Sequence, residues 1–199
     1  VRCWGINSSG ELGIGTFSSN NIGDTVSDTI TNVRLGGPAR KIATGDSHTC
    51  ALMQNGFMRC WGFDGNHQIG NTGSPLSIND PGALGDIPTS DEVAEIGLGR
   101  QHTCALLVDG QATCWGLGSE GQLGRGDTLS HSQPPSSINL GGSSAYLIAG
   151  GTGHTCAVKS NGRARCWGRG DEGQLGQGAT ADALAPTVFP NDIAIFAAP

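Results

Sequence analysis

The chain has 199 residues, of which 34 are glycine, 14% are charged and 5% are aromatic, a composition typical of an all-β protein with many turns. Its 11 lysine and arginine residues stand against 17 aspartate and glutamate residues, and the net charge of −6 without a basic cluster argues against a nucleic-acid partner. No run of about 18 apolar residues occurs, so the sequence predicts no membrane span.

A short motif opens the chain and recurs three times in a longer form. Residues 1–5 read VRCWG, and the longer copies HTCALMQNGFMRCWG, HTCALLVDGQATCWG and HTCAVKSNGRARCWG occupy 48–62, 102–116 and 154–168. The tryptophans of successive copies are 57, 54 and 52 residues apart. A repeat of this length indicates an architecture built from similar units.

Two further blocks accompany the motif. A small-residue stretch precedes each longer copy: KIATG (41–45), EIGLG (95–99) and LIAGG (147–151). A second block follows each tryptophan: GELGIG (10–15), NHQIGN (66–71), GQLGRG (121–126) and GQLGQG (173–178). We expect strand a in the first block, strands b and c in the HTC and CWG halves of the motif, and a short outer strand around the second block. Several short strands per unit are typical of β-propeller blades.

The predicted fold class is all-β: a partial or open β-propeller of about four blades, each a four-stranded antiparallel sheet, with disulfide-stapled b–c hairpins. One propeller region covers 1–199, as a partial repeat, three repeats and the first strand of a next repeat, at 1–40, 41–94, 95–146, 147–194 and 195–199. Because the chain begins at a strand c and ends on a strand a, we expect part of a longer chain. A strand donated by a neighbouring molecule and an open propeller are the alternatives.

The order H-T-C-A-L, glycine, C-W-G and then G-Q-L-G resembles the regulator of chromosome condensation repeat, a β-propeller unit. The resemblance covers essentially the whole chain, and the cysteine-containing form is similar to secreted bacterial repeat proteins. It implies a protein that binds other proteins through the faces and loops of a propeller. Complete members usually have about seven blades, so the resemblance implies an incomplete ring.

The cysteines of each longer copy are ten residues apart, and hairpin geometry predicts that they pair. If Cys50 lies opposite Cys60, the loop is 54–56, three residues with glycine last, and the other copies place glycine identically. The cysteines then form a non-hydrogen-bonded pair with Cα atoms about 4.5 Å apart, which suits a disulfide. A two-residue Asn-Gly loop would offset them. The predicted bridges are Cys50–Cys60, Cys104–Cys114 and Cys156–Cys166.

Cys3 is left over, because its matching HTC strand would precede residue 1, and we expect its partner to lie outside this segment. Three disulfides indicate an oxidising compartment, which predicts an extracellular or cell-surface location. Zinc is disfavoured, since each copy offers only three ligands. A catalytic Cys/His pair is disfavoured because three identical copies indicate an architectural role.

The histidine and tryptophan of each copy are predicted to be structural. We expect a side-chain hydrogen bond to a neighbouring backbone group from His48, His102 and His154. The adjacent threonines should serve strand packing on the opposite strand face. We expect the indole rings to pack as flat apolar surfaces between adjacent blades; these rings belong to Trp4, Trp61, Trp115 and Trp167.

The variable segments between units are candidate contact loops. The longest, at 16–37, is polar, and its candidate contact residues are Asn20, Asn21, Asp24, Asp28 and Asn32. Calcium could bind GDTVSD at 23–28, but the spaced ligands of a dedicated loop are missing, and no other cofactor is predicted. The Arg-Gly-Asp sequences at 125–127 and 169–171 are interpreted as coincidental, and Asn7 lies in an N-glycosylation sequon.

These features predict an extracellular or cell-surface β-propeller that acts as a protein-interaction or structural scaffold through its variable loops. A secreted enzyme-inhibitor-like binding protein is the alternative, and guanine-nucleotide exchange, an activity of the family, is disfavoured by the predicted disulfides and the lack of a basic tail. No catalytic triad, carboxylate pair or metal constellation stands out, so an enzyme is not predicted. The expected partner is a protein, or another copy that associates through an open propeller edge.

Overall fold

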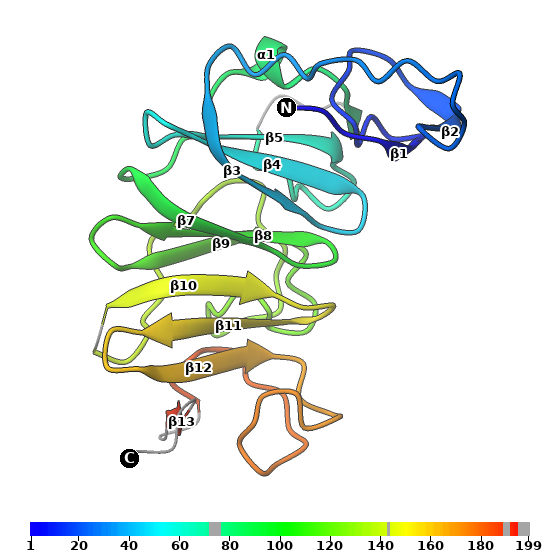
Figure 1. Ribbon diagram of the computed structural model, residues 1–199. Helices are drawn as coiled ribbons and strands as arrows, with labels where there is room; N and C mark the ends of the chain where they lie inside the picture. The colour runs from blue at the N-terminus through cyan, green and yellow to red at the C-terminus, as the bar shows by residue number, and fades with distance from the viewer. Residues whose placement is uncertain (72–76, 143, 189–191, 195–199) are drawn as a thin grey trace.

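The computed structural model describes residues 1–71, 77–142, 144–188 and 192–194, which form an almost entirely β structure (Figure 1). The strands make four antiparallel sheets: one of two strands, one of three and two of four. The two-stranded sheet pairs β1 (Gly5–Asn7) with β2 (Ser18–Ile22). A four-residue helix, α1 (Pro81–Leu84), follows Asp80, whose carboxylate accepts a hydrogen bond from the Gly82 N–H.

The other three sheets each contain one longer copy of the motif, with strands in sequence order across the sheet. The next sheet along the chain holds β3 (Ala39–Thr44), β4 (His48–Met53), β5 (Met58–Phe63) and β6 (Ser77–Ile78). It is followed by β7 (Val93–Leu98), β8 (His102–Leu107) and β9 (Ala112–Gly116). The last sheet holds β10 (Ala145–Gly150), β11 (His154–Lys159), β12 (Arg163–Gly168) and β13 (Ile193–Ala194). The sheets are stacked in an array that does not close, which confirms the predicted all-β fold of a partial or open propeller (Figure 1).

The b–c hairpin has the expected register in all three copies. Met53 N–H donates to the Phe57 carbonyl at 2.8 Å and closes a three-residue loop. The last loop residue, Gly56, has a φ of 84°, a left-handed conformation that glycine adopts at little cost. The resulting cross-strand partners are Cys50 with Cys60, Cys104 with Cys114, and Cys156 with Cys166.

The expected outer strand around the glycine-rich block is wrong. These blocks form turns, in which the equivalent residues Gly70, Gly124 and Gly176 have φ values of 79°, 72° and 67°. A left-handed glycine does not continue a pleated strand, so the chain reverses there. In two sheets the outer strand lies later in the sequence, at β6 and at β13. Beside β9, isolated β-bridges take the place of an outer strand.

The inner strands of neighbouring sheets approach each other closely. A Cβ added to Gly97 of β7 would lie 2.6 Å from the Ile148 carbonyl oxygen of β10. One added to Gly150 would lie 2.4 Å from the Gly99 backbone nitrogen. The small residues before each HTC strand therefore let the backbones of successive sheets pack directly together.

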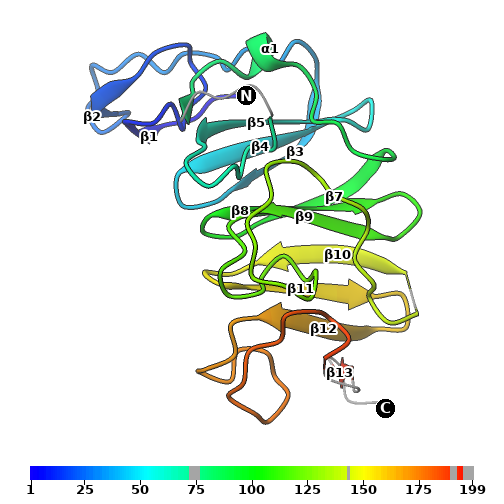
Figure 2. The same ribbon diagram turned by 180° about the vertical axis from the view of Figure 1, so that it is seen from behind.

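The first unit projects sideways from one end of the stack (Figures 1 and 2). Arg2 forms an isolated bridge with Asn32, and the buried Val33 and Leu35 pack into the core of the β3–β6 sheet. This unit is therefore anchored through its last residues, while its hairpin extends away. The unit boundaries given above stay a prediction, and the strand expected at 195–199 lies outside the described residues.

Candidate functional site

Three disulfides join the b and c strands. The bonded pairs are Cys50–Cys60, Cys104–Cys114 and Cys156–Cys166, each with Cα atoms 4.1 Å apart. This short separation is that of a non-hydrogen-bonded antiparallel pair. The stapled hairpins follow directly from the register of the repeat. Within the described residues Cys3 is a free thiol, and its expected partner outside this segment stays a prediction.

The repeated histidines connect neighbouring sheets. His48 Nε2 lies 2.9 Å from Thr103 Oγ1, and His102 Nε2 lies 2.9 Å from Thr155 Oγ1. Thr103 in turn donates to the Gln68 carbonyl at 2.7 Å, and Thr155 donates to the Gln122 carbonyl at 2.8 Å. Because each hydroxyl hydrogen is used on a carbonyl, the imidazole must be the donor to the threonine oxygen.

The expected backbone partner of these histidines is therefore wrong for His48 and His102. Their partner is a side chain, the threonine of the next HTC copy along the chain. Thr103 and Thr155 also do more than pack, since each links an imidazole to a carbonyl of the glycine-rich block. The sequence pair His-Thr thus supplies both halves of a contact between units.

Burial keeps these imidazoles neutral. Desolvation lowers the pKa of His48 to about 4, and burial, with smaller contributions from the charges of His48 and His154, lowers that of His102 to about 3. Burial also lowers the pKa of His154, which is less enclosed. Neither His48 Nδ1 nor His102 Nδ1 has a hydrogen-bond partner among the described residues. Across those same residues no group of three or more His, Cys, Asp or Glu side chains could hold a metal ion.

Three of the four repeated tryptophans are fully buried. Trp61, Trp115 and Trp167 are 0% exposed. The indole N–H of Trp61 donates to the Glu11 carbonyl at 2.8 Å, and that of Trp167 donates to the Gln122 carbonyl at 3.0 Å. Each acceptor belongs to the glycine-rich block of the preceding unit, so these rings pack between units as plates.

Trp4 differs from the other three tryptophans. It is 68% exposed, so the expectation that it packs between adjacent blades is wrong for this chain. The buried rings of Trp61 and Trp167 lie against the glycine-rich block of a preceding unit, whereas Trp4 belongs to the first unit of the chain. Trp4 therefore presents an apolar surface at the end of the stack.

Hydrogen bonds fix part of the predicted contact loop, residues 16–37. The Asp28 carboxylate accepts hydrogen bonds from the Gly23 and Thr25 N–H groups and from the Thr25 hydroxyl. These bonds, that of Gly23 first, lower the pKa of Asp28. Asn32 accepts a bond from the Arg2 side chain at 3.1 Å. Asp28 and Asn32 thus shape the loop.

The other candidate contact residues are exposed: Asn20, Asn21 and Asp24. Two exposed apolar residues of the same segment were missed by the sequence reasoning, which looked for polar groups. Phe17 is 53% exposed and Val26 is fully exposed. A hydrophobic residue at the tip of a polar, projecting loop is the signal that could have found them.

Asn7 is unsuited to glycosylation in this fold. It is 0% exposed, its amide donates to the Thr16 carbonyl at 2.9 Å, and its side-chain oxygen accepts from the Leu12 N–H. In the second Arg-Gly-Asp sequence the two charged side chains bind each other, since Arg169 donates two 2.7 Å hydrogen bonds to Asp171. Both motifs serve local structure.

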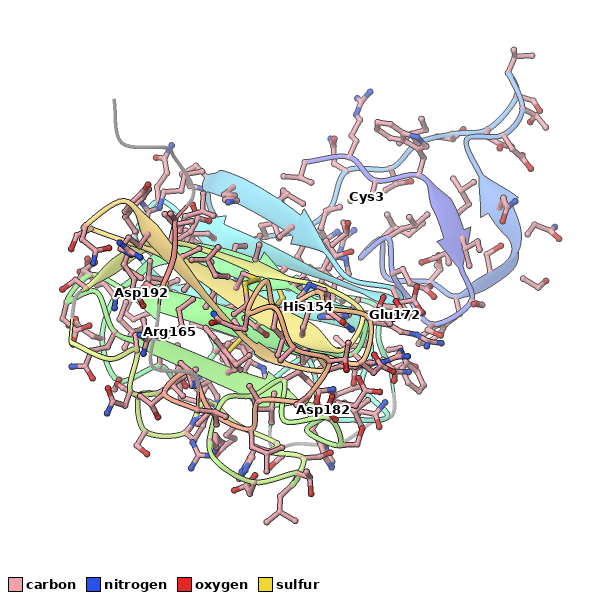
Figure 3. The ribbon with its side chains drawn as sticks, turned by 90° about the horizontal axis from the view of Figure 1, so that it is seen from below. Cys3, His154, Arg165, Glu172, Asp182 and Asp192 are labelled. Atoms are coloured by element: carbon pink, nitrogen blue, oxygen red, sulfur yellow. A yellow bond between two sulfur atoms is a disulfide. The ribbon has the colours of Figure 1, made fainter. Side chains whose placement is uncertain are left out.

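A buried ionic cluster lies at the other end of the stack (Figure 3). Asp192 accepts from Arg165 and from Lys159, and Lys159 also donates to the Gly141 carbonyl at 3.1 Å. Burial would raise the pKa of Asp192, but the bonds and charges of Lys159 and Arg165 outweigh it and lower the pKa. The sequence spacing could have revealed the Arg165–Asp192 pair, which is 27 residues apart. Arg59 and Asp86, which also pair, have the same separation.

The framework of the chain matches a known repeat. The model of the regulator of chromosome condensation (RCC1) repeat matches 39–68, 93–122 and 147–174, and a second model of this repeat matches 109–158. Together the matches cover more than half of the chain. The chain belongs to the RCC1 repeat family. In this RCC1-repeat chain, each match to the first model contains strands a, b and c and the start of the glycine-rich turn.

Relatives with RCC1 repeats are longer than this chain. Human "Probable E3 ubiquitin-protein ligase HERC4" is 34% identical over 94% of this chain and 17% of the relative. The Arabidopsis thaliana "Ultraviolet-B receptor UVR8" is 29% identical over 96% of this chain and 42% of the relative. The chain therefore spans less than half the length of either relative.

Solved RCC1-type structures have the same fold. Human WBSCR16 superposes with a TM-score of 0.80 and 24% identity, over 96% of this chain and 48% of that protein. Prp20p from Saccharomyces cerevisiae superposes with a TM-score of 0.74 and 21% identity, over 94% and 45%. These similarities show the propeller fold. No helix in the described part of the chain is long and apolar enough to cross a membrane.

Proposed function

We propose that this RCC1-repeat chain is part of a protein-interaction scaffold whose contact surface is the projecting first unit. One observation carries the proposal: loop 16–37 extends from the stack and exposes Phe17 and Val26 beside three exposed polar residues. Apolar side chains set among polar ones are typical of protein-binding surfaces. Most of the repeated His, Thr and Trp side chains, by contrast, are buried in contacts between sheets.

Related folds support a protein partner. One solved neighbour is yeast RCC1 with Kap60 bound to it, and Prp20p has binding properties toward Gsp1p and histones. The proposed role is binding without catalysis.

A photo-crosslinking experiment tests the contact surface. A photoreactive amino acid at Val26 is expected to give protein adducts in the native host, because this side chain is fully exposed on the projecting loop. The matched control is Val108, which is 55% exposed on a b–c hairpin of the framework. We expect several-fold more adduct from position 26, reduced by Phe17→Ser. Equal adduct at both positions would show that the loop is not the contact surface.

We also propose that the scaffold works in an oxidising compartment, outside the cell or on its surface. Three disulfides in a chain of this size support this location, since cytosolic thiols are kept reduced.

Thiol labelling on intact cells tests the location. The bridge to probe is Cys156–Cys166, because Cys156 is only partly buried. Both cysteines are expected to resist a membrane-impermeant maleimide until an impermeant reductant opens their bridge, and then to be labelled without cell lysis. Labelling of either cysteine before reduction would contradict the bridge. Labelling that requires lysis would contradict the surface location while leaving the contact loop untouched.

A further inference from the structure

A small pocket lies where the unit of the β7–β9 sheet meets the unit of the β10–β13 sheet. Its volume is about 290 Å³, and its walls come from the glycine-rich turn after β9 and from the segments 136–139 and 185–187. Five of the lining residues have polar side chains: Arg125, Ser136, Ser137, Asn139 and Thr187. Among the described residues that line the pocket none is acidic, so Arg125 gives it a positive charge.

The turn that carries Arg125 is fixed on both sides. A Cβ added to Gly124 would lie 2.6 Å from Trp167 Nε1, so this glycine packs directly on a buried indole ring. On the other side, the Gly126 N–H donates to the Leu184 carbonyl at 2.8 Å. The backbone around Arg125 is therefore held against the next unit, and its side chain starts from a defined place beside the pocket.

The repeat itself does not require an arginine at this position. The corresponding residues of the other three glycine-rich blocks are Ile14, Asn71 and Gln177. The same turn therefore forms with an apolar, an amide or a charged side chain. Because the framework does not account for the charge of Arg125, we looked for its role in what the pocket can bind.

The guanidinium of Arg125 is poorly satisfied by the protein. Its Nε is buried and has no hydrogen-bond partner among the described residues. In the same part of the chain, its one hydrogen bond runs from Nη1 to the Ser136 carbonyl at 3.4 Å, at the long end of the range. A buried charged donor without an acceptor is costly, and an anion in the pocket would remove that cost.

The other arginines of the chain show which acceptor suits this group. In Arg169 the Nε and Nη2 atoms donate to the two carboxylate oxygens of Asp171, each at 2.7 Å, which is the bidentate fork of a guanidinium with a carboxylate. The Nε atoms of three more arginines also donate to aspartates, in the pairs Arg59–Asp86, Arg100–Asp46 and Arg165–Asp192.

The nearest acidic residue in the sequence is engaged elsewhere. Asp127 follows Arg125 as Asp171 follows Arg169, with one glycine between them. Its carboxylate accepts from the Leu129 N–H at 3.0 Å and lies 3.8 Å from His131 Nε2. The first Arg-Gly-Asp sequence therefore lacks the internal pair that the second one forms.

We propose that this pocket binds a carboxylate, presented by an aspartate or glutamate side chain of a protein partner. The Nε and Nη2 groups of Arg125 donate to the two oxygens, as Arg169 donates to Asp171. Asn139 uses its side-chain oxygen to accept from the Gly141 N–H at 2.9 Å, so its NH₂ group is the part left to donate. The small volume suits a single side chain, since drug-sized ligands occupy about 300–1,000 Å³.

Charge favours a carboxylate over a phosphate in this pocket. Arg125 is the single cationic side chain among the described lining residues, and the whole chain has a net charge of −6. A dianion is repelled by this field more strongly than a monoanion. The assignment of the carboxylate to a protein rests on the proposed scaffold function, and it adds a contact point remote in sequence from loop 16–37.

NMR of the arginine Nε–H groups tests the proposal during titration with the peptide N-acetyl-Ala-Glu-Ala-amide. The Arg125 Nε–H signal is expected to move downfield, while that of Arg165, which already donates to Asp192, stays in place. We expect a Kd on the order of 1–10 mM for one bidentate ion pair, and binding at least about tenfold weaker for the matching peptide with Gln in place of Glu. Equal responses to the two peptides would overturn the proposal.

Three variants separate the fork from general charge, with the Gly124 amide signal as the common readout. Arg125→Gln introduces the residue found at position 177, so the turn should form while the preference for the Glu peptide disappears. Arg125→Lys keeps the charge but loses the fork, and should bind about tenfold more weakly. Arg34→Gln removes one charge at an exposed position and should bind as the wild type does. Wild-type affinity in Arg125→Lys, or an equal loss in Arg34→Gln, would contradict a built carboxylate site.

Two further ligands identify the source of the anion. Inorganic phosphate at matched ionic strength should bind more weakly than the Glu peptide, and tighter binding of phosphate would refute the carboxylate assignment. Propionate should shift the same signals as the peptide, whereas a response to propionate without one to the peptide would rule out a protein side chain. Photo-crosslinking from Val26 does not involve this pocket, so either proposal can fail while the other stands.

Discussion

Acidification from pH 7 to about pH 4 is expected to destabilise the stack by several kcal/mol through two histidines. The pKa is about 4 for His48 and about 3 for His102, both below the ordinary value of 6.5. The fold holds the neutral imidazoles, so their contribution is complete above pH 6.5 and is lost as the pH falls toward the folded-state values. At 1.36 kcal/mol per pKa unit, the full losses are about 3 and about 5 kcal/mol.

Urea unfolding at several pH values measures this loss. His102→Gln keeps a side-chain donor for Thr155 but removes one titrating group, so the slope of unfolding free energy against pH should fall by about 1.4 kcal/mol per pH unit between pH 6 and 4. The control is His67→Asn at an exposed position with a φ of 63°, which asparagine tolerates. It should leave the slope unchanged. An unaltered slope in His102→Gln would show that the buried imidazole is not the acid-sensitive group.

The hairpins could be predicted from the sequence because local geometry determines them. Cysteines ten residues apart, with glycine third in the loop, admit one register that places the sulfurs face to face. The outer strand could not be predicted, because it comes from variable segments as short as Ser77–Ile78, which carry no alternation of apolar and polar residues. The glycine-rich block repeats more clearly, but it repeats as a turn.

The contacts between units escaped prediction for a different reason. The partners His48 and Thr103 are 55 residues apart, and a single copy of the motif shows a histidine and a threonine with no relation to each other. Their relation appears only when successive copies are placed side by side in space. The same holds for Asn7, whose sequon is visible in the sequence while its burial is a property of the folded first unit.

Truncation to alanine should cost far more stability at the last tryptophan of the series than at the first. Trp167→Ala is expected to cost about 3–5 kcal/mol of unfolding free energy, because it removes a ring that is 0% exposed and leaves a cavity. It also leaves the Gln122 carbonyl without the indole N–H, although Thr155 still donates to it. Trp4→Ala is expected to cost less than about 0.5 kcal/mol, since the ring is 68% exposed.

Denaturant unfolding of both variants checks this contrast, with wild-type slopes confirming that the native state is comparable. A large loss in Trp4→Ala would mean that its ring is already packed in the isolated chain, and the open end would not exist as described. If the contrast holds, Trp4 is a repeat residue whose counterparts are buried and whose own surface is unoccupied.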